Sequence, residues 1–138
     1  MTSAVVARKV ADLRAHVARV RALLPPTAEA FAAHRTEAEA LMLNLMIAIQ
    51  STTDLAMHVV ADKGLGVPSD ARAAFETLVR DGLLDADVAR RLGAAVAVRN
   101  RIAHQYGTLD LALVHAAARD GLADLEGMAS AVASAYGI

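Results

Sequence analysis

The chain has 138 residues, of which 56% are hydrophobic and only 3% aromatic, which allows one domain over residues 1–138 and favours an all-helical fold. Its net charge of −1 means that the chain as a whole does not attract polyanions, so any contact with nucleic acid must depend on a local cluster of arginines. There is no cysteine, which excludes disulfides and thiolate metal sites.

The N-terminus is charged rather than apolar, because it carries Arg8, Lys9, Asp12 and Arg14 in quick succession, so it does not resemble a signal peptide. The longest uncharged run in the middle of the chain, residues 41–53, is too short to cross a bilayer and contains polar residues. We therefore expect a protein of the cytoplasm that has no membrane partner.

The first part of the chain predicts two helices. Apolar residues recur at alternating steps of four and three and form one stripe, which consists of Val6, Val10, Leu13, Val17, Val20 and Leu24. Pro25-Pro26 ends this helix, because proline lacks an N–H and restricts the residue before it. Thr27 can cap a second helix over residues 28–62, which can bend near residues 34–36.

The centre of this second helix, residues 41–49, is apolar nearly all round. Such a helix is buried on more than one side. One side can pack in the core of the domain, and the other could meet a partner chain, for which a second copy of the same chain is the simplest choice. A central helix in a single bundle would have the same pattern, so both interpretations stay open.

The rest of the chain predicts three more helices. The glycines of the loop at residues 64–68 lack the spacing of a phosphate-binding loop. Each helix after the loop is preceded by a residue that can cap it, and two of them end near a glycine. The caps are Ser69, Asp85 and Asp110, and the stops are Gly82 and, just after Tyr106, Gly107. The predicted fold is an up-and-down four-helix bundle with one short extra helix.

Reactive polar residues crowd together in one stretch, Arg99-Asn100-Arg101-Ile102-Ala103-His104-Gln105-Tyr106. A neutral His104 can take the proton from a ribose 2′-hydroxyl, whose oxygen then attacks the adjacent phosphorus, and a protonated histidine can supply the leaving 5′-oxygen. Arg99 can hold two phosphate oxygens and stabilise the charge that grows in the transition state. This chemistry needs no metal or other cofactor, and it requires RNA because DNA lacks the 2′-hydroxyl.

Arg99 and His104 are five residues apart, which on a straight helix places them roughly 140° apart, at about 100° per residue. They can reach one phosphate if the helix loosens before His104, or if two copies face each other across a two-fold axis. In such a dimer one histidine would act as base and the other as acid. Four arginines, doubled by symmetry, would supply the local positive field: Arg90, Arg91, Arg99 and Arg101.

A simpler explanation of the same stretch is also open. Cations suit the negative end of the helix dipole, so an arginine-rich last turn before a glycine is ordinary at a helix C-terminus.

Asp54 and His58, four apart on the second helix, share a face, and an aspartate can orient a neighbouring imidazole or guanidinium. The same spacing fits a surface contact, and the pair lacks the further ligands that a zinc site needs, so we predict no metal site.

The octapeptide resembles the R-x4-H-x-Y motif of HEPN-domain ribonucleases, in particular the HepT toxin family. The resemblance extends to the flanking elements: Ala48-Ile49, Asp54, Ala56 and His58, then Gly66-Val67-Pro68, Phe75 and Leu78, and finally Val98-Arg99-Asn100, His104 and Tyr106. It covers most of the chain, from about residue 41 to the C-terminus, whereas the first helix fits only by pattern.

The resemblance implies a HEPN-like bundle that dimerises and has a composite site at the dimer cleft. Arg99 and His104 would be the catalytic pair, supported by Asn100, Asp54 and His58, and Arg101 and Arg91 would contact RNA. Tyr106 would accept AMP groups from a cognate MNT-type nucleotidyltransferase antitoxin, which would add bulk and negative charge beside the phosphate-binding arginine. One departure is Ala103, which stands where the family usually has a bulky aliphatic residue and could loosen the packing around His104.

The leading hypothesis is therefore a metal-independent RNA endonuclease that acts as the toxin of a toxin–antitoxin pair of the type II/VII kind. The alternative is a non-catalytic HEPN-type module that pairs with a nucleotidyltransferase and holds nucleotide or RNA. A third hypothesis, a purely structural helical dimer, is supported by the apolar residues 41–49.

Overall fold

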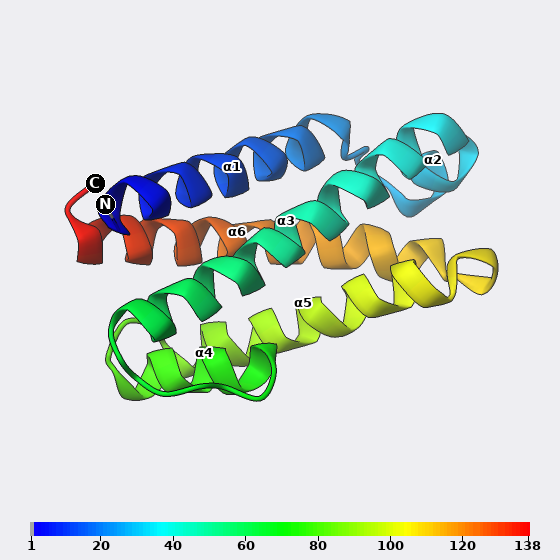
Figure 1. Cartoon of the computed structure of the whole chain (residues 1–138). Coiled ribbons are helices and arrows are strands. Elements are labelled where there is room, and N and C mark those ends of the chain that lie inside the picture. The colour runs from blue at the N-terminus through cyan, green and yellow to red at the C-terminus, as the bar shows by residue number, and fades with distance from the viewer. Residues whose placement is uncertain (1) are drawn as a thin grey trace.

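The computed structural model describes residues 2–138, and every regular element in this range is a helix. Four long helices form the bundle: α1 (Thr2–Leu23), α3 (Arg35–Asp62), α5 (Ala86–His104) and α6 (Leu111–Tyr136). They alternate in direction along the chain (Figure 1). The smaller elements are α2 (Ala28–Ala33), α4 (Ala71–Arg80) and the 3-10 turn η1 (Tyr106–Thr108). The predicted all-helical bundle is confirmed, but it has two short helices and not one.

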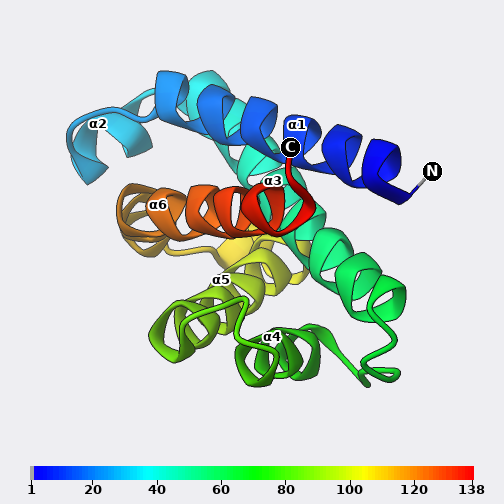
Figure 2. The ribbon, with the colours of Figure 1, turned by 90° about the vertical axis from the view of Figure 1, so that its left-hand side faces the viewer.

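Helix α3 is the centre of the bundle and contacts every other α-helix. Figure 2 shows α1 packed on one side of α3, with α6 and α5 beside it and α4 below α5. This central position explains why the middle of α3 is apolar nearly all round. By length and composition α3 could also cross a membrane, but 44% of its most apolar stretch is buried inside the fold.

One side of α3 nevertheless stays open. Leu43 is 54% exposed, and its neighbours Met46 and Ile47 are only half-buried. Packing within one chain therefore accounts for most of the apolar surface of α3 but leaves an apolar strip on its outer side. Both interpretations of residues 41–49 remain compatible with this arrangement.

The core contains the stripe predicted for the first helix and a similar one on α6. All members of the α1 stripe are buried except Leu24, which is half-buried beside Pro25. On α6 the buried positions recur every three or four residues, at Val114, Ala118, Leu122, Leu125, Met128 and Val132. Full burial of one aliphatic side chain stabilises a fold by about 1.5–3 kcal/mol, so these two stripes fix how α1 and α6 seat on α3.

Side-chain caps set the starts of the helices, mostly where the sequence predicted them. Thr27 Oγ1 accepts a hydrogen bond from the Ala30 N–H at 3.1 Å. Asp85 and Asp110 cap α5 and α6 through contacts of 3.1 and 3.0 Å. The predicted Ser69 cap is wrong, because α4 begins one residue later and Asp70 Oδ1 accepts the Ala73 N–H at 2.8 Å. A carboxylate suits the positive end of the helix.

Two predicted helices end earlier than expected. The bend predicted near residues 34–36 is a complete break, since His34 has φ −119° and ψ 80° and separates α2 from α3. Helix α5 ends at His104 and does not continue to Tyr106, because Gln105 leaves the helical region and the next three residues form η1. Gly107 lies inside this turn and its φ is not positive, so it does not act as a left-handed helix stop.

Candidate functional site

The last turn of α5 is regular and firmly seated. Ile102 is only 3% exposed, and the Gln105 N–H donates to the Arg101 carbonyl at 2.8 Å, which completes the α-helical pattern. Helix α5 therefore does not loosen before His104, and the first of the two arrangements considered for Arg99 and His104 is wrong. Within one chain these two side chains leave a straight helix in different directions.

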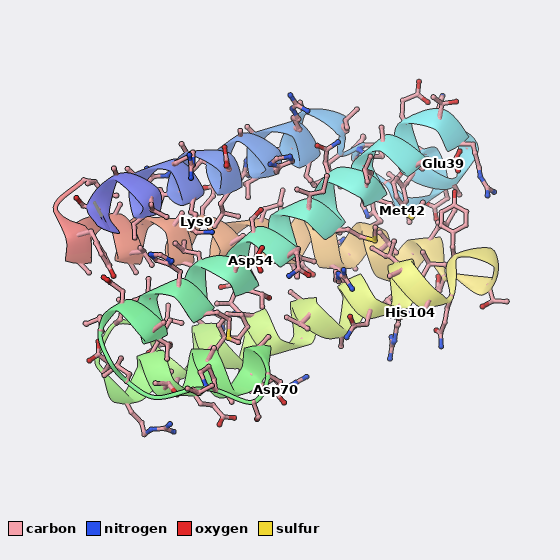
Figure 3. The ribbon with its side chains drawn as sticks, in the orientation of Figure 1. Lys9, Glu39, Met42, Asp54, Asp70 and His104 are labelled. Carbon is pink, nitrogen blue, oxygen red and sulfur yellow. The ribbon has the colours of Figure 1, made fainter. Side chains whose placement is uncertain are left out.

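His104 lies at the free surface of the bundle. Its imidazole points away from the other helices (Figure 3), and the side chain is exposed. It makes no hydrogen bond to any residue between 2 and 138. An exposed imidazole near the end of a helix can exchange protons with a bound ligand or with water, which is what a general acid or base requires.

Arg99 is half-buried on the same helix. Its Nη1 donates to Asn100 Oδ1 at 3.3 Å, whereas its Nε is fully covered and has no partner among the residues that the structure describes. A covered donor without a partner costs free energy, and the guanidinium is the group that best matches two phosphate oxygens. The orientation of Arg99 is thus set by Asn100, the residue predicted to support it.

Tyr106 is held by the beginning of α3. Its hydroxyl donates a hydrogen bond to Glu39 Oε2, and the guanidinium carbon of Arg35 lies 5.7 Å from the centre of its ring. The contact with Glu39 raises the pKa of Tyr106, because the carboxylate holds the phenol proton and disfavours a second negative charge. Tyr106 as a whole is 40% exposed. Sequence reasoning missed Glu39 and Arg35, whose only signal was a charged pair four apart at a helix start.

Asp54 and His58 do not contact each other. Asp54 accepts a hydrogen bond from Gln50 Nε2 at 3.1 Å, while His58 Nε2 is covered and has no partner in the described chain. Figure 3 shows Asp54 halfway along α3, well away from His104 at the end of α5. Within one chain these two residues therefore do not join the motif, and their supporting role stays a prediction.

The sequence of this chain resembles those of known proteins. The family described as "Ribonuclease HepT-like" matches residues 13–132. The chain belongs to this family. The mRNA nuclease HepT of Shewanella oneidensis is 25% identical to this HepT-like chain over 122 residues, which cover 88% of the chain and 91% of that protein.

Solved structures agree in fold with this HepT-like protein. The tri-AMPylated HEPN toxin of Shewanella oneidensis, solved in complex with an MNT antitoxin, is 23% identical and has a TM-score of 0.85, with 94% of this chain and 96% of that chain covered. A toxin–antitoxin complex named MntA–HpeT, carrying a tyrosine-to-alanine mutation, is 22% identical with a TM-score of 0.83, with 94% and 98% covered. The HEPN-like fold predicted from the resemblance is confirmed.

The arginines of the HepT-like protein differ in whether they pair with an acidic side chain. Arg91 makes two hydrogen bonds to Asp124, at 2.9 and 3.1 Å, and this carboxylate raises the pKa of Arg91. Arg90 lies 3.5 Å from Asp87. Arg101 is exposed. The positive field near the motif therefore comes mainly from Arg99 and Arg101, and the partner of Arg91, which lies on another helix, could not be read from the sequence.

Between residues 2 and 138, no group of three histidine, aspartate or glutamate side chains is arranged to hold a metal ion.

Ala103 is exposed within one chain, so its small side chain leaves no gap in the core beneath His104. Any effect of this alanine on activity would arise at a contact with another molecule.

Proposed function

We propose that this HepT-like protein is a metal-independent RNA endonuclease and the toxin of a toxin–antitoxin pair. The observation that carries the proposal is the motif itself: Arg99, His104 and Tyr106 stand in the family order at the exposed end of α5. The family match over residues 13–132 and the relative that is named an mRNA nuclease support the same activity.

The active site would be composite. Because α5 is straight through His104, Arg99 and His104 of one chain cannot easily meet at one phosphate, so we propose that two copies each contribute both residues to a shared cleft. The outer strip of α3, where Leu43 is 54% exposed, offers an apolar surface for the second copy. Asp54, on the same helix, would then support the partner's site.

The reaction would begin when one His104 takes the proton from a ribose 2′-hydroxyl. The 2′-oxygen then attacks the adjacent phosphorus, the bond from phosphorus to the 5′-oxygen breaks, and the second His104 gives its proton to that leaving oxygen. Arg99 would hold the non-bridging phosphate oxygens throughout. The products would be a 2′,3′-cyclic phosphate and a free 5′-hydroxyl, and Arg101 would hold the neighbouring backbone of the RNA.

The partner would be a nucleotidyltransferase antitoxin of the MNT type. A structural relative is a tri-AMPylated toxin in complex with such an antitoxin. Tyr106 is partly exposed two residues after His104, so an AMP group on it would put bulk and negative charge at the site. Adenylation of Tyr106 would thereby prevent RNA from binding.

The experiment is expression of the chain without an antitoxin. Wild type should slow growth and leave new RNA ends with 2′,3′-cyclic phosphates, and His104→Ala should abolish both effects. His16→Ala is a matched control, because His16 lies on α1 and bonds only to the Asp12 carbonyl of its own helix. Equal growth and equal RNA integrity for wild type and His104→Ala would reject the nuclease. RNA that is bound and protected without new ends would favour the non-catalytic binding module, which the exposed Arg101 would also serve.

A further inference from the structure

The turn η1 is fastened to a distant part of the chain. Tyr106 and Glu39 are 67 residues apart in sequence, yet the tyrosine hydroxyl donates directly to the Glu39 carboxylate. Arg35 completes the contact, since its Nε lies 3.9 Å from Glu39 Oε1 and its guanidinium sits over the Tyr106 ring. The three side chains form what we call the tyrosine clamp: Arg35, Glu39 and Tyr106.

Few other contacts hold the three residues of this turn, although Leu109, which follows it, packs against the core. None of its three residues is buried, and its backbone hydrogen bonds are local: the Thr108 N–H donates to the Gln105 carbonyl at 3.0 Å and the Leu109 N–H to the Tyr106 carbonyl at 3.4 Å. Such bonds close a turn but do not attach it to the bundle. The tyrosine clamp is therefore the principal side-chain attachment of η1 to α3 within the described chain.

His104 depends on this attachment because only Gln105 separates it from the turn. Helix ends fray when nothing holds the chain beyond them. Ile102 anchors the last turn from the core side, but His104 itself is exposed and makes no contact that would fix its ring. The backbone after His104 is therefore held at two points, where Tyr106 meets Glu39 and where Leu109 packs against the core.

We propose that Glu39 is a positioning residue for His104: it holds Tyr106, and Tyr106 holds the turn that fixes the end of α5. The inference rests on the proposed function in so far as His104 acts on RNA. Arg35 contributes by keeping the Glu39 carboxylate and the Tyr106 ring together. Glu39 does not touch the substrate.

The clamp also gives the modification of Tyr106 a second effect. When the tyrosyl oxygen attacks the α-phosphorus of a nucleoside triphosphate, pyrophosphate leaves and the phenol proton is lost to a base. The ester oxygen then has no hydrogen to donate, and the new phosphodiester carries a negative charge beside Glu39. The new charge would repel Glu39 and attract Arg35. Adenylation would therefore break the contact between η1 and Glu39 and also obstruct the site.

Amide hydrogen exchange of residues 103–109 tests the clamp without any partner or substrate. Removal of a partly exposed, charge-assisted hydrogen bond in Glu39→Ala or in Tyr106→Phe should speed exchange in this segment by about 3- to 10-fold. The double variant should exchange no faster than the faster single variant, because both remove the same contact. Glu37→Ala is the matched control, an exposed glutamate two residues away on α3. Exchange in Glu39→Ala equal to that in Glu37→Ala would overturn the clamp.

RNA cleavage tests the consequence for His104. Glu39→Ala should lower kcat by about 3- to 10-fold with little change in KM, and Glu39→Gln, which keeps an acceptor for the hydroxyl, should recover part of the loss. Faster exchange with an unchanged kcat would overturn the positioning role. If the wild type cleaves no RNA, the proposed function fails, while the exchange measurement still decides whether the clamp exists.

Discussion

Replacement of Leu43 by alanine tests whether two copies pair through the outer side of α3. Leu43 is 54% exposed in the single chain, and Met46 and Ile47 beside it are half-buried. The half of Leu43 that is already buried contributes about 1 kcal/mol to the stability of its own bundle. If the strip is the contact between copies, the open half of each Leu43 becomes buried on pairing.

The magnitude follows from that exposure. Full burial of a leucine side chain is worth about 1.5–3 kcal/mol, so burial of the remaining half is worth about 1 kcal/mol per copy. A two-fold contact uses the residue twice, which gives about 2 kcal/mol for the dimer. Leu43→Ala should therefore weaken pairing by about 30-fold, since about 1.4 kcal/mol corresponds to a factor of ten in Kd.

Sedimentation velocity over a range of concentrations measures this Kd directly. Val67→Ala is the control, because Val67 is 99% exposed in the loop after α3 and a loss of aliphatic carbons there should leave pairing unchanged. Thermal unfolding of Leu43→Ala should begin at a lower temperature than that of Val67→Ala at the same concentration, because weaker pairing stabilises the folded chain less. A wild-type chain that stays monomeric, or a Leu43→Ala dimer as tight as the wild type, would refute the composite site on this face.

Three further outcomes can be checked. Mixing wild type with an equal amount of His104→Ala and allowing exchange should leave about one half of the RNase activity present before exchange, because only dimers with two intact histidines would act; undiminished activity would indicate independent sites. Asp70→Ala should cost about 1 kcal/mol in chemical denaturation, whereas Ser69→Ala should cost close to nothing. Burial and Asp62 raise the pKa of Tyr136 to about 12, so its stabilising contact is complete below about pH 10 and is lost as the pH rises through 12. The free energy of unfolding of Tyr136→Phe should therefore fall less over that pH range than that of the wild type.

The elements that could be predicted were those with a local physical signal. The α1 stripe appears in the sequence because burial repeats every three or four residues, and Asp85 and Asp110 could be assigned as caps because their carboxylates act on amides two residues away. The sequence predicted a bend near residues 34–36 but not a complete break at His34, since the residues on both sides of it favour helix. Helix ends are decided by small differences in free energy between neighbouring residues.

The candidate site, like the fold, could be predicted from the sequence only in part. The motif residues could be named from their order in the chain, and their roles remain predictions. Whether α5 stays straight to His104 could not be decided, because Gly107 suggested a later end and the chain leaves the helix at Gln105 instead. The link from Tyr106 to Glu39 joins an exposed turn to an exposed helix start, and such a pair leaves no periodic pattern in the sequence.

One turn of α3 separates Glu39 from Leu43, so the carboxylate that fastens η1 and the leucine expected at the contact between copies belong to the same rigid rod. Thermodynamic linkage then makes subunit pairing and the state of Tyr106 reciprocal. If adenylation loosens the dimer by a given factor, the assembled dimer must resist adenylation by that same factor. The equilibrium of adenylation would accordingly be less favourable in the assembled dimer than in the dissociated chain.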